Sequence, residues 1–422
     1  MNKKSLVIVL VMLLSFSGCG GIRDIFTVEE AIVEDTAGED LKSGTANDGS
    51  DAEKPKDTEG DADEPAETDG QPDTKPVTEG YARSLLTPEQ KLWYDDMAGA
   101  LLRFDGTIRL SEEGIKAGLN EKNVDAIFQS VMNDHPELFY VEGYSYTNFT
   151  LGNDTVAVDF TGSYSMAGKE MVERKSQIEA AVEEILKGAP RDADDYVKIK
   201  YAYEYLIENT EYDIEALENQ NIYSVFVGHY SVCQGYAKAF QYLMHRMGVE
   251  CALIQGKVIH TGEGHAWNLV KCNDLYYYVD PTWGDISYRI AECGEESTPD
   301  GISYDYLNIT EEALSHTHMR TEPVTVPPCT ATRDNFYVRE NAFFDEYNRE
   351  QFRELVDRML ADGGKCIALR CGNSDCFSDM KKILIEEQEI FEYIPKNLGL
   401  SLAYTVDEVQ YSMTFFMMTS EE

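Results

Sequence analysis

Apolar positions recur with helical or strand spacing over most of the chain beyond its first 80 residues. After Thr87 they repeat at helical spacing, and they do so again after Asn120. Two alternating stretches follow, at 144–150 and 156–160, which is typical of a β-hairpin. The pattern therefore predicts an α+β accessory region over residues 81–165.

Two further predicted helices, at 168–187 and 192–209, lead into a third whose start carries polar signals. Ser231 and Gln234 stand at the spacing of a capping box, so this helix is expected to begin at Ser231. Cys233 is then expected in the first turn. Free N–H groups and the helix dipole favour a thiolate at that position.

Two strand-like runs, 266–272 and 275–280, predict a hairpin with a two-residue Asn-Asp turn. If the residues that flank the turn face each other, His265 also faces Thr282 and lies diagonal to Asp280 on one face of the sheet. Diagonal neighbours lie about 7–8 Å apart at the backbone, which these two side chains can bridge. A change of one residue in the turn would put them on opposite faces.

Cys233, His265 and Asp280 stand in the order of a thiol nucleophile, its base and the residue that orients the base. Each has a simpler interpretation when taken alone. A cysteine in an amphipathic helix is usually a small core residue, a histidine on a half-buried strand is usually structural, and an aspartate before Pro-Thr often forms a turn. The three together favour a catalytic triad.

The sequence around these residues resembles the transglutaminase-like superfamily over about residues 200–285. Four motifs occur in order: Cys233-Gln-Gly-Tyr-Ala, Gly248-Val-Glu-Cys-Ala, His265-Ala-Trp-Asn and Val279-Asp-Pro-Thr-Trp-Gly-Asp. The resemblance implies an α+β, papain-like core in which the cysteine helix packs on an antiparallel sheet. It also implies a nucleophilic Cys233, a general base and acid at His265, and an orienting Asp280.

The resemblance does not imply one substrate, because the superfamily includes protein cross-linkers, peptidases, other amide hydrolases and members without activity. The oxyanion formed during attack on a carbonyl needs donors close to the nucleophile. The backbone N–H of Cys233 is one candidate. Tyr212 and Gln234 are candidates for the second donor, although either could serve packing or capping instead.

Other residues are candidates for contact with the substrate. His260 precedes a Gly-rich loop and competes with His265 for the role of base, but only His265 has the predicted relation to Asp280. We therefore keep His260 as a substrate contact. Trp267 and Trp283 are expected to flank the site as aromatic walls, and core packing is the alternative for both.

The first 18 residues predict an export signal, because a basic start precedes a short apolar run and small residues. The end of this segment, Ser17-Gly18-Cys19, resembles the lipobox of bacterial lipoproteins and implies a lipid on Cys19. Phe16 stands where that motif usually has an aliphatic residue, so an ordinary secretory signal is the alternative. We expect a lipoprotein on the outer face of a bacterial cytoplasmic membrane, or a secreted protein.

Residues 19–80 are expected to form an acidic tether. Between residues 28 and 80 there are 18 acidic and 4 basic side chains and no aromatic one, too little apolar surface to form a core. The formal net charge of the whole chain, −41, argues against a nucleic-acid partner, whose phosphates would be repelled.

The hydrophobic pattern assigns a core to residues 166–310 and a small α/β module to residues 329–422. The clearest elements of the module are two helices and two strands, at 349–360, 377–387, 366–370 and 411–417. Its three cysteines lack a fourth ligand at metal spacing, and His316 and His318 are too isolated to indicate a metal site. We expect neither a metal nor a cofactor.

The sequence as a whole predicts an exported, membrane-tethered cysteine enzyme that acts on amide bonds through an acyl-enzyme. Hydrolysis of a peptide or a peptide-like amide is the expected reaction. The substrate would be a protein or a peptide, with cell-wall peptides among the candidates. The alternatives are protein transamidation, which cross-links chains, and a surface binding or structural module that keeps the triad without activity.

Overall fold

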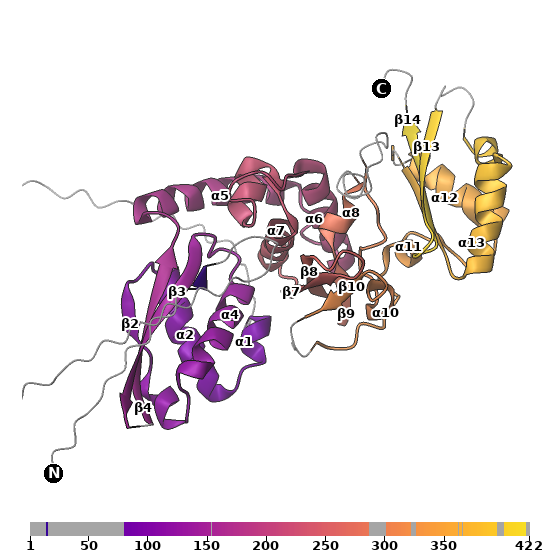
Figure 1. Cartoon of the computed structure of the whole chain (residues 1–422). Helices are drawn as coiled ribbons and strands as arrows, with labels where there is room; N and C mark the ends of the chain where they lie inside the picture. Colours follow the sequence, from indigo (N-terminus) through magenta and orange to yellow (C-terminus); the bar gives the residue numbers. More distant parts are fainter. Residues whose placement is uncertain are drawn as a thin grey trace, which may run out of the picture.

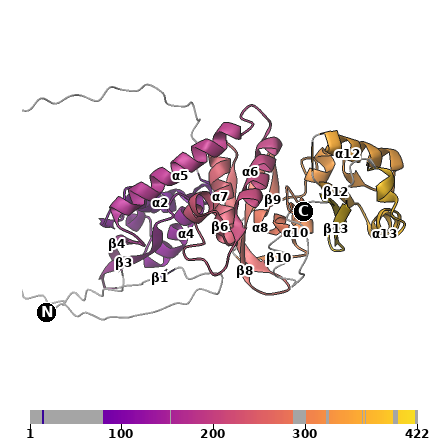
Figure 2. The same ribbon diagram turned by 90° about the horizontal axis from the view of Figure 1, so that it is seen from above.

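A computed structural model describes residues 14–15, 80–152, 154–286, 301–321, 326–361, 363–364, 366–394 and 401–418. The proposed lipidation site Cys19, residues 19–79 of the tether and all but two residues of the export signal lie outside this set. The described chain forms an N-terminal region, a central core and a C-terminal module, which lie in a row in both views (Figures 1 and 2). Among the helices that the structure describes, none combines the length and the apolar character needed to cross a bilayer.

The N-terminal region is an antiparallel sheet packed against helices, with strand order β1-β3-β4-β2. Its long helix begins after Thr87, as predicted, and Thr87 and Gln90 form a capping box at its start. Phe128 and Phe160 are part of the core between helix and sheet, with ring centroids 6.1 Å apart. The helical elements are α1 (Tyr81–Ser84), α2 (Pro88–Leu102), α3 (Glu112–Lys116), η1 (Glu121–Asn123) and α4 (Val124–Asp134). The strands are β1 (Leu14–Ser15), β2 (Thr107–Arg109), β3 (Val141–Leu151) and β4 (Asp154–Tyr164).

The central core consists of helices packed on a second antiparallel sheet, with strand order β10-β7-β8-β9. The helices are α5 (Gly168–Gly188), α6 (Asp195–Asn209), the π-helix η2 (Ser224–Gly228), α7 (Cys233–Arg246), α8 (Pro281–Gly284) and α10 (Glu311–Leu314). The sheet strands are β7 (Cys251–Val258), β8 (Gly264–Cys272), β9 (Leu275–Val279) and β10 (His318–Arg320). The sheet therefore continues beyond residue 310, where the sequence pattern places the end of the core.

The contact between α7 and the sheet fixes the direction of the cysteine helix. Asn268 Nδ2 on β8 donates to the Ala237 carbonyl at 3.0 Å, and Ala266 packs against Ala237. At the other end of α7, Gln241 Nε2 lies 3.4 Å from the carbonyl of Cys251, which pairs with Val270 further along β8. The helix consequently runs in the direction of β8, and its first residue lies toward the first residues of that strand.

The predicted capping box at the start of α7 does not form. The helix begins at Cys233, with Val232 as its N-cap and no side-chain cap. Ser231 belongs to β6 (Tyr230–Ser231), which pairs in parallel with β5 (Glu211–Tyr212), and its Oγ lies 2.7 Å from the Asn219 carbonyl. Strand pairing thus holds Ser231 in extended structure, and its hydroxyl binds the Asn219 carbonyl instead of capping the helix.

The C-terminal module carries a third sheet, with strand order β11-β12-β14-β13 and mixed pairing. It contacts the core at Asp305, a buried carboxylate that accepts hydrogen bonds from Tyr337 Oη at 2.9 Å and Ser412 Oγ at 2.8 Å. Its strands are β11 (Phe343–Phe344), β12 (Cys366–Cys371), β13 (Ser401–Asp407) and β14 (Ser412–Met418). Its helical elements are α11 (Phe336–Arg339), α12 (Arg349–Ala361), α13 (Ser374–Lys381), η3 (Lys382–Glu386) and η4 (Glu389–Glu392). Helices combined with largely antiparallel sheets make the chain an α+β protein, as predicted.

Candidate active site

The hairpin of β8 and β9 brings His265 and Asp280 into hydrogen-bond contact. Cys272 faces Leu275 across the two-residue turn, which confirms the register expected from the sequence. The distance between His265 Nε2 and Asp280 Oδ2 is 2.6 Å. The predicted pairing of His265 with Thr282 does not form, because the chain leaves the sheet after Val279 and enters α8.

Asp280 is the N-cap of α8. Its Oδ1 accepts a hydrogen bond from the backbone N–H of Trp283 at 3.1 Å, while its Oδ2 faces His265. Only 1 % of the residue is exposed. Burial by itself raises the pKa of this carboxyl, but the His265 and His318 imidazoles beside it hold the pKa well below its ordinary value. Asp280 is therefore a carboxylate at every pH at which the protein would work.

Cys233 is the first residue of α7 and is 2 % exposed. Because α7 runs in the direction of β8, its first turn lies toward the end of β8 that carries His265. The Nε2 atom of His265 is occupied by Asp280, so Nδ1 is the nitrogen that remains to act on the thiol. The structure thus brings the predicted pair His265 and Asp280 together and directs Cys233 toward it.

A second imidazole, His318, contacts the same carboxylate oxygen. Its Nε2 lies 3.0 Å from Asp280 Oδ2, and its side chain is fully buried. His318 is the first residue of the edge strand β10 and pairs with Val258 of β7. Sequence reasoning missed it, because it lies 38 residues beyond Asp280 and no local motif marks it. Its signal in the sequence is limited to a histidine at the start of a short strand-like run.

Aromatic rings surround the two imidazoles. Trp267 is fully buried and stacks on His265, with ring centroids 6.0 Å apart and an interplanar angle of 23°. Trp283 meets His265 edge-on at 6.2 Å, and the exposed His260 meets Trp283 edge-on at 6.3 Å. Both tryptophans therefore lie beside His265, while His260 lies on the outer side of Trp283.

The two candidates for the second oxyanion donor lie near Cys233 along the chain. Gln234 is the second residue of α7 and is partly exposed. Tyr212, also partly exposed, pairs with Ser231 two residues before Cys233. Both residues therefore stay candidates for the second donor.

His265, Asp280 and His318 are also residues of the kinds that bind metal ions. The ligand atoms of His265, Asp280 and His318 lie within 4.8 Å of one another. The hydrogen bonds of 2.6 and 3.0 Å to Asp280 already satisfy these atoms. Cys366, Cys371 and Cys376 of the C-terminal module are free cysteines.

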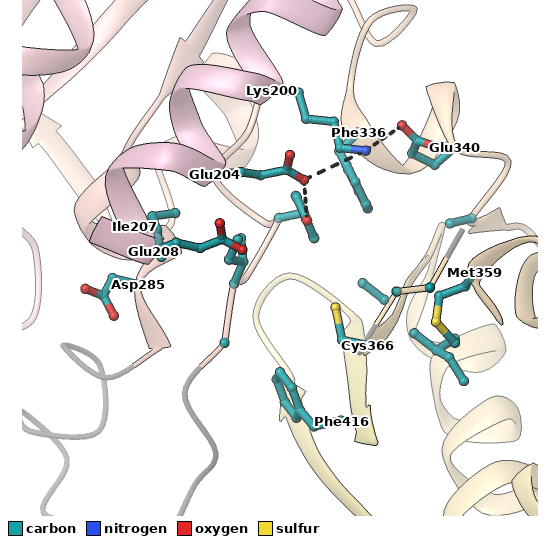
Figure 3. A pocket seen from close by; sticks show the side chains of 18 of the residues that line it. Lys200, Glu204, Ile207, Glu208, Asp285, Phe336, Glu340, Met359, Cys366 and Phe416 are labelled. Carbon is teal, nitrogen blue, oxygen red and sulfur yellow. Dashed lines mark hydrogen bonds and ion pairs between the residues drawn. The ribbon is translucent and has the colours of Figure 1, made fainter. Parts of the chain in front are cut away.

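A cavity of about 1350 Å³ lies between α6 and the C-terminal module (Figure 3). Lys200 and Glu204 of α6 point into it from one side, and Cys366 and Phe416 of the module line the other side. Neither His265 nor Asp280 lines this cavity, and of the site residues predicted from the sequence only Tyr212 does. The cavity is thus separate from the His265–Asp280 pair.

Comparison with known proteins finds a family match within the central core. Residues 180–281 match the family model of the transglutaminase-like superfamily. This part of the chain is a transglutaminase-like domain. The match covers all three predicted triad residues and ends before β10, so His318 lies outside it.

Two curated relatives are similar to the chain over this domain. The kyphoscoliosis peptidase of Mus musculus is 26 % identical over 133 residues, which cover 28 % of this chain and 20 % of the mouse protein. The kyphoscoliosis peptidase of Homo sapiens is 26 % identical over 128 residues, which cover 27 % of this chain and 19 % of the human protein. The chain thus spans about one fifth of the length of these relatives.

Two solved structures are similar to this chain at low TM-scores. One, described as the crystal structure of a TGase, has a TM-score of 0.24 and 16 % identity, over 34 % of this chain and 44 % of that chain. The other is the periplasmic domain of TgpA from Pseudomonas aeruginosa, with a TM-score of 0.20 and 11 % identity, over 35 % of this chain and 70 % of that chain. Similarity at this level says nothing about the activity of this chain.

Proposed function

We propose that this protein is a cysteine enzyme that acts on amide bonds, with Cys233 as nucleophile, His265 as base and Asp280 as the residue that orients the base. The observation that carries the proposal is the buried 2.6 Å hydrogen bond between His265 and Asp280. This pair lies at the end of the sheet toward which the first turn of α7, with Cys233, is directed. The match of residues 180–281 to the transglutaminase-like superfamily supports it.

The proposed reaction begins with proton transfer from the Cys233 thiol to His265 Nδ1. The imidazolium that results is stabilised by Asp280, which accepts its Nε2–H. The thiolate then attacks the amide carbonyl, and the backbone N–H groups of the first turn of α7 are suited to stabilise the oxyanion. His265 returns the proton to the leaving amine, and the acyl group remains on Cys233.

The acyl-enzyme can pass its acyl group to water or to an amine. We propose hydrolysis of a peptide or peptide-like amide as the first outcome, because the curated relatives at 26 % identity are named peptidases. One observation favours transamidation as a second candidate. Cys233 is 2 % exposed and His265 is 6 % exposed, so the thioester would be shielded from water until an amine enters.

Incubation of the protein with an unfolded protein substrate and a fluorescent primary amine separates the two reactions. New peptide N-termini indicate hydrolysis, and incorporation of the amine indicates transamidation. Cys233→Ala should abolish either signal, whereas Cys251→Ala, a matched change of another buried cysteine, should retain it. Alkylation of Cys233 no faster than that of Cys251 would favour the non-catalytic binding module.

We also propose that the protein is exported and anchored to a membrane through a lipid on Cys19. The support is the sequence of the first 19 residues. Expression of the whole chain in a bacterium, followed by mass spectrometry of the N-terminal peptide, tests the proposal. A diacylglyceryl mass on Cys19 that is absent from Cys19→Ser is expected. An unmodified N-terminus produced by cleavage elsewhere would indicate the secreted alternative.

A further inference from the structure

We propose that His318 is a positioning residue of this site, a second imidazole that donates a hydrogen bond to Asp280 Oδ2 and holds the carboxylate in place for His265. The proposal rests on the catalytic role proposed above for Cys233, His265 and Asp280, and it adds a residue from outside the matched domain.

The hydrogen bonds to Asp280 show what His318 adds. Oδ1 accepts from the N–H of Trp283 at 3.1 Å, and Oδ2 lies 2.6 Å from His265 Nε2 and 3.0 Å from His318 Nε2. A carboxylate bound on both oxygens, with two donors on one of them, is restrained against rotation about its Cβ–Cγ bond. Because His265 takes its orientation from this oxygen, a fixed carboxylate also fixes the imidazole that faces Cys233.

The contacts of His318 determine which of its nitrogens carries the proton. Nε2 faces a carboxylate, which accepts only, so Nε2 must be the donor. Nδ1 lies 2.7 Å from Thr317 Oγ1, and the hydroxyl can donate to it. Thr317 Oγ1 also lies 3.3 Å from the Leu314 carbonyl, a longer contact. Both nitrogens of His318 are therefore engaged away from Cys233, which leaves His265 as the base.

The surroundings of His318 favour the neutral imidazole. Burial lowers its pKa below the ordinary value, Asp280 raises the pKa in part, and His265 lowers it again. Aromatic rings pack around it, with the ring centroids of Trp283, Trp267 and Tyr306 at 4.7, 5.1 and 5.7 Å. A neutral donor stabilises the carboxylate without adding a positive charge beside His265, so it does not oppose formation of the His265 imidazolium.

The backbone holds His318 in this position from outside the triad hairpin. Strand β10 pairs with β7, with His318 opposite Val258, and the N–H of Ile259 donates to the Thr317 carbonyl at 2.8 Å. The neighbouring Met319 is exposed, as alternation along a strand requires. The imidazole is thus directed into the site by sheet pairing and needs no ligand to place it.

Two substitutions of His318 in the full chain test the role. His318→Gln keeps an N–H donor at similar reach, whereas His318→Leu keeps apolar volume and removes the donor. His316→Leu is the matched control, because His316 is exposed and lies two residues away. The measurement is the rate of Cys233 alkylation by iodoacetamide from pH 5 to 9, followed by mass spectrometry. Circular dichroism of each variant establishes whether it is folded.

We expect His318→Leu to slow alkylation at pH 6 about tenfold, the scale of one lost hydrogen bond to a charged group. The midpoint of the alkylation profile should move upward with it, because the thiolate–imidazolium pair forms less readily. His318→Gln should stay within about threefold of the unsubstituted protein on the same scale, and His316→Leu should not differ from it. Equal profiles for His318→Leu and the unsubstituted protein, or equal losses in the Leu and Gln variants, would overturn the proposal.

A measurement on the unsubstituted protein covers the case in which His318→Leu does not fold. Nitrogen NMR of histidine-labelled protein should show His318 neutral and protonated on Nε2 at pH 7 to 8, and an Nδ1–H tautomer or an imidazolium would contradict the role. Failure of the proposed function has a different signature. There Cys233 of the unsubstituted protein would react no faster than Cys251, whatever stands at position 318.

Discussion

At the scale of single residues, the site depends on differences among buried cysteines. Burial raises the pKa of Cys251 well above that of a free thiol and raises the pKa of Cys272 to about 12. Cys233 is equally buried, but it begins a helix and lies toward an imidazole bound to a carboxylate. Position in the fold, more than exposure, therefore separates the candidate nucleophile from the structural thiols.

Selective alkylation should report this difference. At pH 7 we expect iodoacetamide to modify Cys233 of the folded protein at least about tenfold faster than Cys251 or Cys272, because the thiolate is the reacting species. Peptide mass spectrometry over a time course gives the three rates. Denatured protein is the control, in which the three rates should converge. Equal rates in the folded protein would mean that Cys233 is one more inert core thiol.

The neutral state proposed for His318 predicts a pH dependence of stability. Its pKa is lowered in the folded protein. Near the ordinary histidine pKa, the unfolded chain therefore binds a proton that the folded chain does not bind. The stability due to this residue is present above about pH 6.5, the unfolded value, and is lost as the pH falls below it. His318→Gln should flatten the decrease in unfolding free energy between pH 7 and 5, measured by urea denaturation. An unchanged slope would contradict the lowered pKa.

At the scale of elements, the hydrophobic pattern of the sequence predicts most helices and strands of the core. The β8–β9 register followed from a two-residue turn, which places His265 and Asp280 on one face. Two features were beyond that reasoning. The Ser231–Gln234 capping signal is local, and pairing of β5 with β6 overrides it. His318 reaches Asp280 through pairing between strands far apart in the chain, which no local spacing encodes.

Close packing at the start of α7 gives a further test. A Cβ on Gly235 would lie 1.9 Å from Ser231 Oγ and 3.2 Å from the Asn221 carbonyl. Gly235→Ala should therefore destabilise the protein by about 1–3 kcal/mol, although alanine favours helices over glycine by about 1 kcal/mol. Chemical denaturation measures the change. In a Ser231→Ala background the cost of Gly235→Ala should be smaller, and a cost that is the same in both backgrounds would rule out this clash.

At the scale of the whole molecule, the three parts are joined by buried or partly buried hydrogen bonds. The Nδ2 atom of Asn133 in α4 donates to the Leu253 carbonyl at 2.9 Å. The backbone carbonyl of Asn133 accepts a hydrogen bond from Gln241 Nε2 at 2.8 Å. The N-terminal region is thereby bound to both β7 and α7. On the other side, Asp305 binds Tyr337 and Ser412 at the contact of the core with the C-terminal module.

Removal of the Asp305 carboxylate should loosen the C-terminal module. Asp305→Ala leaves the buried hydroxyls of Tyr337 and Ser412 without this acceptor, which costs about 1–3 kcal/mol for each group. We expect limited proteolysis to release the module from the variant faster than from the unsubstituted protein. Glu408→Ala is the control, since its ion pair with Lys381 is exposed. Equal cleavage of both variants would show that Asp305 does not hold the contact.

The position of β10 has a consequence for how the core can be used. The family match ends at residue 281, and the strand that supplies His318 begins 37 residues later, on the far edge of the same sheet. A fragment that ends at residue 310 would keep Cys233, His265 and Asp280, yet Asp280 would have one imidazole in place of two. If Cys233, His265 and Asp280 act as proposed, the residues of the family match alone are therefore not a complete site. Moved into another protein without β10, they would keep all three side chains and lose the second donor that holds Asp280.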